Sequence, residues 1–141
     1  MADANSLKRE LAPYPQQLQV HVSGRLENGE RVVAGLFRGR TLRSCVDVKS
    51  HRGMVYCQLL LLFSVENTSK ALVRLFSDDF GTRHPNLKLA GLRPLKRLKK
   101  FQIVDLAQIQ NHVHIVPDGS AEGDPEAFLL NPYVNLCQSK L

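Results

Sequence analysis

MVYCQLLLLFSVENTSKALVRLF, residues 54–76, is the stretch that decides the fold. Its first part, Met54–Val65, is apolar at both alternating sets of positions, which is typical of a central strand covered on both faces. Glu66–Ser69 is a run of turn-forming residues, and Ala71–Phe76 is again largely apolar. The pattern predicts two consecutive strands. A helix is the alternative for Met54–Val65, and it is disfavoured by the glycine before the segment and by the β-like stretches around it.

The chain before this segment also follows a period of two. The run 18–22 alternates Leu and Val with polar residues, which predicts a half-buried strand. Asn28-Gly29 comes next and is the strongest short-range hairpin signal, because both residues tolerate a positive φ. We therefore expect the returning strand over Arg31–Phe37 and a third strand over Leu42–Val48.

Helical signals are few and short. Residues 82–92 are expected to form a loop. Pro94 fits the first turn of a helix, in which Leu95 and Leu98 would lie on one side and face the core. Asp105–Gln108 has the spacing of a capping box, so one short helical turn is expected there.

The rest of the chain predicts short strands around the acidic loop Asp118–Glu126. These strands are Phe101–Val104, His112–Val116, Phe128–Leu130 and Tyr133–Leu136. Many short strands with little helix predict a mostly β fold: a small barrel or curled antiparallel sheet with one or two short helices.

A chain of 141 residues is expected to form one domain. Residues 1–15 are polar and end in Pro13-Tyr14-Pro15, which favours an extended backbone, so we expect a flexible lead-in there. Residues 16–141 are then a single β-rich domain. No apolar run follows the charges at the N-terminus, so an intracellular protein is expected.

The positive charge is concentrated in the middle of the chain. The net charge is +6 and the pI about 9.5. Residues 83–100 carry seven Lys or Arg and no acid, whereas residues 101–141 carry one Lys against five acids. Such a distribution indicates a basic surface for a polyanion, followed by an acidic segment that would screen it or seek it in another copy.

The densest part is Arg93–Lys100, which reads Arg-Pro-Leu-Lys-Arg-Leu-Lys-Lys. Phosphate contacts release counterions, and four or five of them would lower affinity on the order of a hundredfold between 50 and 200 mM salt. Without tryptophan for base stacking, contact would be to phosphates and weakly sequence-specific. The predicted nucleic-acid-binding residues are Arg93, Lys96, Arg97, Lys99, Lys100, Lys88 and Arg83. Further arginines that would extend this patch are Arg25, Arg31, Arg38, Arg40 and Arg43.

The basic run is compatible with roles besides nucleic-acid binding. It is also typical of a solvated face that contacts nothing, of a nuclear-localisation signal, or of a surface for an acidic protein. A protein-interaction or homo-oligomerisation module is the alternative function, because the two-sided apolar segment Met54–Val65 could be covered by a second copy. A cage for methyl-lysine is disfavoured, because Tyr14, Tyr56 and Tyr133 are the only tyrosines and tryptophan is missing.

The cysteines do not predict a disulfide framework or a metal site. Their number is odd, and no two lie close in sequence. Cys45, His51 and Cys57 are spaced Cys-x5-His-x5-Cys, which is not a recognised zinc spacing. His112 and His114 would share a strand face, but two side chains are too few for a site. We expect no metal.

Catalytic chemistry is not indicated either. Asp78-Asp79 stands in a Ser-Asp-Asp-Phe-Gly stretch that turn chemistry explains. No nucleophile–base pair, phosphate-binding glycine loop or cofactor fingerprint is visible. We therefore expect no catalytic residues, no cofactor, no small-molecule substrate and no membrane, and thus no enzyme.

Three short motifs carry a resemblance. They are Leu72–Phe76 (LVRLF) within KALVRLFSDD, Val113–Pro117 (VHIVP) and Asn131–Asn135 (NPYVN). Their order resembles the C-terminal segment of transposases encoded by fungal DNA transposons of the Plavaka and Kyakuja–Dileera–Zisupton type. It also resembles a bromo-adjacent-homology (BAH) module, a β-rich chromatin-associated fold. The resemblance covers about half of the chain and does not include the catalytic part of such a transposase.

Together, the basic run and the resemblance predict a BAH-like β-barrel or curled sheet of transposon origin. We expect a non-catalytic module that binds nucleic acid or chromatin in the nucleus.

Overall fold

The computed structural model describes residues 18–37, 40–51, 53–79, 91–119, 121 and 123–131 of the chain. Nearly all regular structure in these ranges is β, so the prediction of a mostly β fold is confirmed. The strands are β1 (Gln19–His21), β2 (Ser23–Arg25), β3 (Arg31–Phe37), β4 (Arg40–Arg43), β5 (Cys45–Ser50), β6 (Gly53–Val65), β7 (Thr68–Asp78), β8 (Arg93–Asp105), β9 (Ile109–Val113), β10 (Ile115–Pro117) and β11 (Ala127–Leu130).

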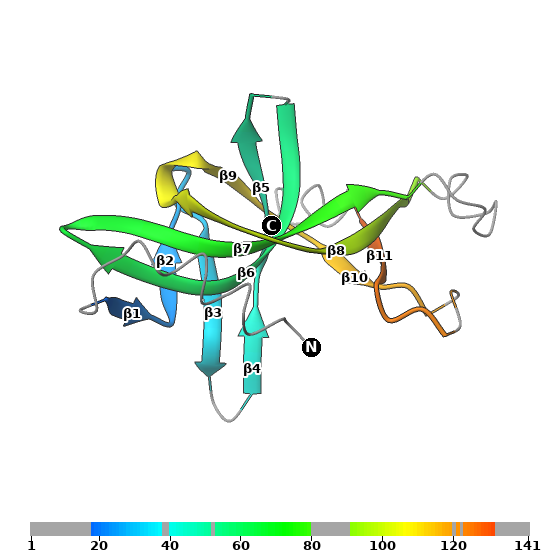
Figure 1. Cartoon of the computed structure of the whole chain (residues 1–141), viewed down its shortest axis with the longest axis horizontal. Coiled ribbons are helices and arrows are strands. Elements are labelled where there is room, and N and C mark those ends of the chain that lie inside the picture. The colour runs from blue at the N-terminus through cyan, green and yellow to red at the C-terminus, as the bar shows by residue number, and fades with distance from the viewer. Residues whose placement is uncertain are drawn as a thin grey trace.

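The strands form a large sheet and a small one, and all pairs are antiparallel. The large sheet has the order β10-β11-β8-β7-β6-β5-β9, with β1 added beside β6, and the small sheet has the order β2-β3-β4. In Figure 1 the long strands β6, β7 and β8 cross the molecule, the β5–β6 hairpin is at the top, and β3 and β4 lie side by side at the bottom.

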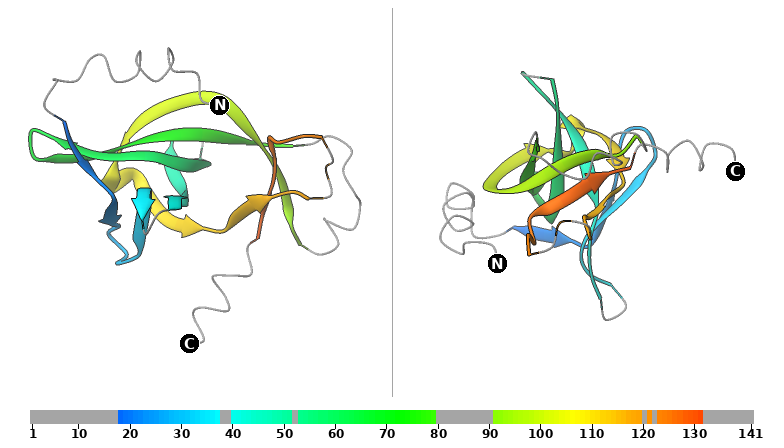
Figure 2. Two further views of the ribbon diagram at one scale, coloured as in Figure 1. Left: turned by 90° about the horizontal axis from the view of Figure 1, so that it is seen from below. Right: turned by 90° about the vertical axis from the view of Figure 1, so that its right-hand side faces the viewer.

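The large sheet is strongly curled. Its order begins with β10 and ends with β9, yet only His114 separates these two strands in the chain. The two ends of the sheet are therefore joined by continuous backbone, and the Asn131 N–H donates to the His114 carbonyl at this junction (2.9 Å). Figure 2 (left) shows β9 running into β10 on the side opposite β7 and β8. Within the described ranges, the strand pairs do not close into a barrel.

The β6–β7 hairpin confirms the strand prediction for residues 54–76, and the helix alternative is wrong. Its turn consists of Glu66 (φ 51°) and Asn67 (φ 63°), and Val65 pairs directly with Thr68. This two-residue turn with two positive φ angles matches the twist of the flanking strands. The turn is shorter than predicted, because Thr68 and Ser69 already belong to β7.

The predicted hairpin at Asn28-Gly29 is also present, between β2 and β3. The Gly29 N–H donates to the Leu26 carbonyl (2.9 Å), and Gly29 has φ 89°, a conformation that favours glycine. The Asn28 side chain reaches across to β9, where its Nδ2 donates to the Gln110 carbonyl (2.9 Å). This contact ties the small sheet to the end of the large one.

Two predicted strands are broken by corners. Leu42–Val48 is divided into β4 and β5 at Ser44, and His112–Val116 is divided into β9 and β10 at His114. The run 18–22 contains β1 alone, and β2 begins just after it. Buried Ser44 joins the two sheets: it exchanges hydrogen bonds with the Val33 backbone, and its carbonyl accepts from the Leu59 N–H (2.9 Å). The two parts of the predicted strand Leu42–Val48 therefore have different neighbours: β4 pairs with β3, and β5 pairs with β6 and β9.

The core lies on both faces of the central strands. Along β7, Ala71 and Val73 belong to the main apolar cluster, whereas Leu72 and Phe76 belong to two clusters on the other face. The buried members of the main cluster are Leu26, Val32, Ala34, Val46, Val48, Cys57, Leu59, Leu62, Ala71, Val73, Val104 and Ile109. The same chain therefore buries Cys57, Leu59, Leu62, Phe63 and Val65 of β6, whereas Met54 at its start is exposed.

The helix predicted at Pro94–Leu98 is wrong, because this segment is the start of β8. Pro94 pairs with Leu129 of β11, and Leu95 pairs with both Phe128 and Asp78. A helix here would leave β7 and β11 without a partner between them, so tertiary pairing overrides the local signal. Of the two leucines expected to face the core, Leu95 is buried and Leu98 is half-buried.

The smaller predictions have mixed outcomes. The short turn at Asp105–Gln108 is confirmed as the 3₁₀ turn η1 (Leu106–Gln108), with the Asp105 N–H donating to Gln108 Oε1 (2.9 Å). Phe128–Leu130 is confirmed within β11. The lead-in 1–15, the loop 82–90 and the strand Tyr133–Leu136 lie outside the described residues. No helix in the described part of the chain is long and apolar enough to cross a membrane.

Candidate nucleic-acid interface

The basic run Arg93–Lys100 forms the beginning of β8, between β7 and β11. Since side chains alternate along a strand, its cations cannot all face the same way. Arg93 and Arg97 share a face with Leu95, and Lys96 lies on the other face. The structure therefore divides the predicted site into two groups.

Arg93 belongs to the first group and is paired with Asp78 at the end of β7. Its Nε and Nη2 donate to the two carboxylate oxygens at 2.5 and 2.7 Å, and its guanidinium lies 5.3 Å from the centre of the Tyr56 ring. Hydrogen bonding to Arg93 lowers the pKa of the Asp78 carboxyl. β7 extends through Asp78, two residues beyond the predicted end of this strand at Phe76, and the last residues of the predicted turn lie outside the described ones.

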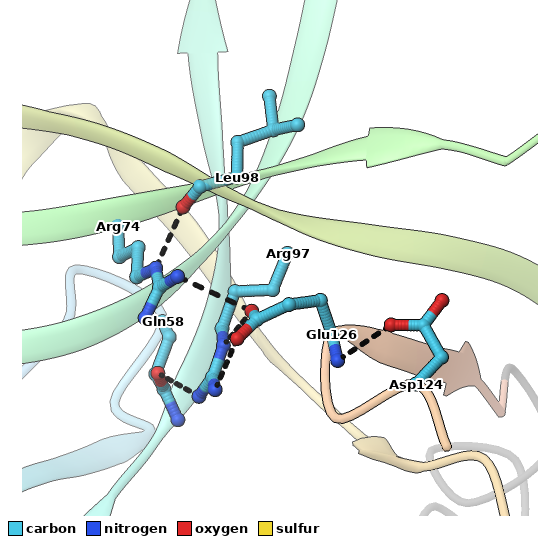
Figure 3. Close-up of polar contacts among 6 residues, drawn as sticks. All are labelled: Gln58, Arg74, Arg97, Leu98, Asp124 and Glu126. Carbon is cyan, nitrogen blue, oxygen red and sulfur yellow. Dashed lines mark hydrogen bonds and ion pairs between the residues drawn. The ribbon is translucent and has the colours of Figure 1, made fainter. Parts of the chain in front are cut away.

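Arg97 is turned towards the molecule and binds Glu126. Its Nε and Nη2 donate to the two oxygens of this carboxylate at 2.8 and 3.3 Å, and its Nη1 donates to Gln58 Oε1 at 3.4 Å (Figure 3). The guanidinium also lies 4.9 Å from the centre of the Phe128 ring. Two parallel N–H bonds to one carboxylate fix its position and orientation.

Arg74 of β7 completes this cluster, and sequence reasoning missed it. The side chain is only 5% exposed; its Nη2 donates to Glu126 Oε2 (3.2 Å) and its Nε to the Leu98 carbonyl (2.6 Å). Figure 3 shows both arginines directed at the same carboxylate. A signal was available, because Arg74 is the single charge within the apolar run Ala71–Phe76. A buried charge needs a partner.

The Leu98 carbonyl is available to Arg74 because β8 bulges at this point. Arg74 pairs with Phe101 and Phe76 pairs with Arg97, so Leu75 faces three residues, Leu98–Lys100, across the shifted register. A bulge takes residues out of the ladder and changes the direction of their side chains. Consequently Lys99 and Lys100 are both exposed, although neighbouring residues of a regular strand would lie on opposite faces.

The second group consists of Lys96, Lys99 and Lys100. All three are exposed, and within the described ranges none of them is in an ion pair. Lys88 and Arg83 lie outside the described residues, as does Arg38. Arg25, Arg31, Arg40 and Arg43 lie on the small sheet, which does not pair with β8. These four arginines therefore do not continue the surface of β8 along neighbouring strands.

The acidic segment binds the basic run within the same chain. Glu126 meets Arg97 and Arg74, its N–H donates to Asp124 Oδ1 (3.0 Å), and its carbonyl accepts from the Arg97 N–H (2.8 Å). Of the two possibilities raised by the charge pattern, the described residues show screening inside one molecule. Hydrogen bonding to Arg97 is the main reason why the pKa of Glu126 is lowered.

Burial and like charge act on Arg74 in the same direction. Loss of hydration lowers its pKa most, proximity to Arg97 lowers it further, and Glu126 opposes both effects. Arg43, at the end of β4, also contributes to the lowering. Arg74 and Arg97 thus share one carboxylate, that of Glu126.

Cys45 and Cys57 are core residues. Burial raises the pKa values of Cys45 and Cys57 to about 12, so both are thiols at neutral pH and poor metal ligands. In the described part of the chain, no three side chains of His, Cys, Asp or Glu gather as they would around a metal.

Comparison of this chain with protein-family models, with curated proteins and with solved structures finds no match. The site itself consists of two groups. Arg93 and Arg97 are ion-paired within the fold, whereas Lys96, Lys99 and Lys100 are exposed.

Replacing Arg74 by Ala is expected to lower the free energy of unfolding by about 2–4 kcal/mol, because the Leu98 carbonyl and part of the Glu126 carboxylate lose a charged donor. Arg93→Ala is the matched control. Its side chain is 50% exposed and its ion pair is solvated, so a loss below about 1 kcal/mol is expected. Urea denaturation measures both, and equal losses would contradict the structural role of Arg74.

Glu126→Gln is expected to destabilise the protein at pH 7 and to lose this effect in acid. The folded pKa of Glu126 lies below its ordinary value of 4.5, so its stabilising charge is fully present above that pH and is lost as the pH falls through the folded pKa. The difference in unfolding free energy between wild type and variant should therefore shrink from pH 7 to pH 3. Glu66→Gln, at an exposed turn, is the control. A difference that does not vary with pH would refute the assignment.

Proposed function

We propose that this protein is a non-catalytic module that binds the phosphate backbone of nucleic acid through Lys96, Lys99 and Lys100. The observation that carries the proposal is the bulge in β8, which presents two neighbouring lysines at the surface on a rigid strand. The arginines of the same run are held by Asp78 and Glu126, so they do not compete for the ligand.

The spacing and chemistry of these lysines fit phosphate better than base edges. A strand rises about 3.3 Å per residue, so the Cα atoms of Lys96 and Lys100 are at most about 13 Å apart. Each ammonium group is a flexible point charge that follows the backbone of a strand without reading its sequence. Binding is therefore expected to be salt-dependent and weakly sequence-specific.

The proposal includes a BAH-like module of transposon origin that acts on chromatin in the nucleus. It is supported by the three motifs that resemble fungal transposases and by a curled antiparallel sheet whose two ends meet at His114. The arginine of the first motif is Arg74, whose burial gives a physical reason for an arginine at that place.

Fluorescence anisotropy with a labelled DNA duplex tests whether Lys96, Lys99 and Lys100 bind the phosphate backbone. Three phosphate contacts predict an affinity that falls roughly 40-fold between 50 and 200 mM salt. In the triple variant Lys96→Gln, Lys99→Gln, Lys100→Gln, the slope of log affinity against log salt should become shallower by about 2–3.

Lys49→Gln serves as the control, because Lys49 is an exposed lysine on β5, away from the bulge. Its salt slope should equal that of the wild type. If the triple variant keeps the wild-type affinity and slope, the lysines of β8 are not the contact.

A second candidate is self-association through the small sheet. Val22 and Leu42 are 44% and 38% exposed, and both flank Gly35: Leu42 pairs with it, and a Cβ at Gly35 would lie 3.8 Å from Val22. Exposed apolar side chains around a glycine offer a flat surface on which a second copy could pack.

Light scattering of the double variant Val22→Asp, Leu42→Asp tests self-association. If the wild type is a dimer, the double variant should be a monomer, whereas Met54→Asp, at a 46% exposed position on β6, should leave the mass unchanged. A wild type that is monomeric at high concentration would exclude this candidate.

A further inference from the structure

A pocket with two cations in its lining lies among residues of β1, β2, the β6–β7 hairpin and η1, rather than at the bulge in β8. Its volume is about 280 Å³, and β1, β2 and the β6–β7 hairpin are at the left of Figure 1. Leu62, Phe63 and Leu106 supply its apolar lining. A recess of this size holds a small chemical group with a short apolar body.

The polar lining of the pocket includes two cations, Arg25 and Lys70, together with the His21 ring and two serine hydroxyl groups. None of its described lining residues is acidic. Lys70 is additionally held by Asp105 at 2.6 Å, and the His21 ring lies within hydrogen-bond distance of Ser64 Oγ (3.0 Å). These contacts fix the Lys70 and His21 side chains at the rim.

Arg25 is the group best placed to meet a ligand. It is exposed, and its guanidinium donates to the Gly29 carbonyl at a long 3.3 Å. It also pairs directly with Arg31 across the β2–β3 ladder, while Arg31 Nη2 donates to Ser23 Oγ (3.2 Å). Like charges opposite each other destabilise a sheet. Neither arginine is in an ion pair with any described residue, so an anion bound at Arg25 would relieve a repulsion that the described residues leave uncompensated.

The small residues of the pocket fit a phosphate group. Ser23 and Ser69 bring hydroxyl groups, and Gly24 lets a ligand approach the backbone. Guanidinium, ammonium and hydroxyl donors around a space without carboxylates are the groups that bind phosphate oxygens.

We propose that this pocket binds a phosphomonoester whose apolar body rests on Leu62 and Phe63. Two sources share this chemistry: a free small molecule and the 5′-phosphate at the end of a nucleic-acid strand. The site is independent of the proposed backbone contact through Lys96, Lys99 and Lys100, because it lies on other strands.

Nuclear magnetic resonance titration with phenyl phosphate tests the pocket. The amide signals of Gly24, Arg25 and Ser69 should shift, and Arg25→Gln should weaken binding at least fivefold. Lys49→Gln is the control with the same change of charge, because Lys49 is exposed on β5 and does not line the pocket; the affinity of this variant should change less than twofold. Equal binding by wild type and Arg25→Gln would overturn the proposal.

Gly24→Ala provides a test that removes no charge. A methyl group there would lie 3.7 Å from Leu106 and 3.9 Å from Leu62, which is ordinary contact, so the fold should be kept while the pocket becomes narrower. Phenyl phosphate should bind at least threefold more weakly. Unchanged binding in this variant would place the ligand elsewhere and count against the pocket.

A further experiment distinguishes a small-molecule phosphate from the 5′-phosphate of a nucleic-acid strand. It uses the variant Lys96→Gln, Lys99→Gln, Lys100→Gln, in which the proposed contact with the nucleic-acid backbone is removed. A short single-stranded oligonucleotide with a 5′-phosphate is compared with the same strand without it. Binding that needs the terminal phosphate assigns the site to strand ends, and binding of phenyl phosphate without oligonucleotide binding assigns it to small molecules. Failure of both ligands overturns this proposal, whereas failure of the duplex titration alone affects only the β8 lysines.

Discussion

The arrangement of the large sheet depends on one pair of interactions. These are the ion pairs that the Glu126 carboxylate makes with Arg74 and with Arg97. They join β7, β8 and the segment that leads into β11 at one point. Arg74 lies between two apolar clusters on the same face of β7, with Leu72 on one side and Phe76 on the other. A guanidinium is tolerated there only because a carboxylate, the Leu98 carbonyl and an aromatic ring replace its water. The bulge in β8 supplies that carbonyl, so the cluster and the bulge require each other.

This constraint also divides the basic run by chemistry. Its arginines have planar groups that bind carboxylates through two parallel bonds and stack on Tyr56 and Phe128, and both are part of the fold. Its lysines are compact, strongly hydrated charges, and they stay at the surface. The same bulge that satisfies Arg74 turns Lys99 and Lys100 outward. The bulge in β8 therefore explains both the burial of Arg74 and the exposure of Lys99 and Lys100.

The described cations do not all lie on one strand surface. The exposed lysines of the bulge lie on β8, whereas Arg25 and Arg31 lie on the small sheet. The corner at Ser44 joins the two sheets, because Ser44 bonds to Val33 of one sheet and to Leu59 of the other. The two proposed phosphate contacts, at the β8 lysines and at Arg25, are therefore on different strands.

The sequence by itself determined the period-two pattern, the hairpin turns at Asn28-Gly29 and Glu66-Asn67, the short turn before β9 and the mostly β class. These features depend on neighbouring residues, so local propensity is enough to predict them. Only the tertiary structure decided that Arg93–Lys100 is a strand, that its arginines are neutralised, and that Arg74 meets Glu126. Each of these outcomes depends on a partner that is distant in the chain: Glu126 is 52 residues from Arg74 and 29 from Arg97. Which residues are buried or ion-paired depends on which strands become neighbours, and the local sequence pattern does not specify that pairing.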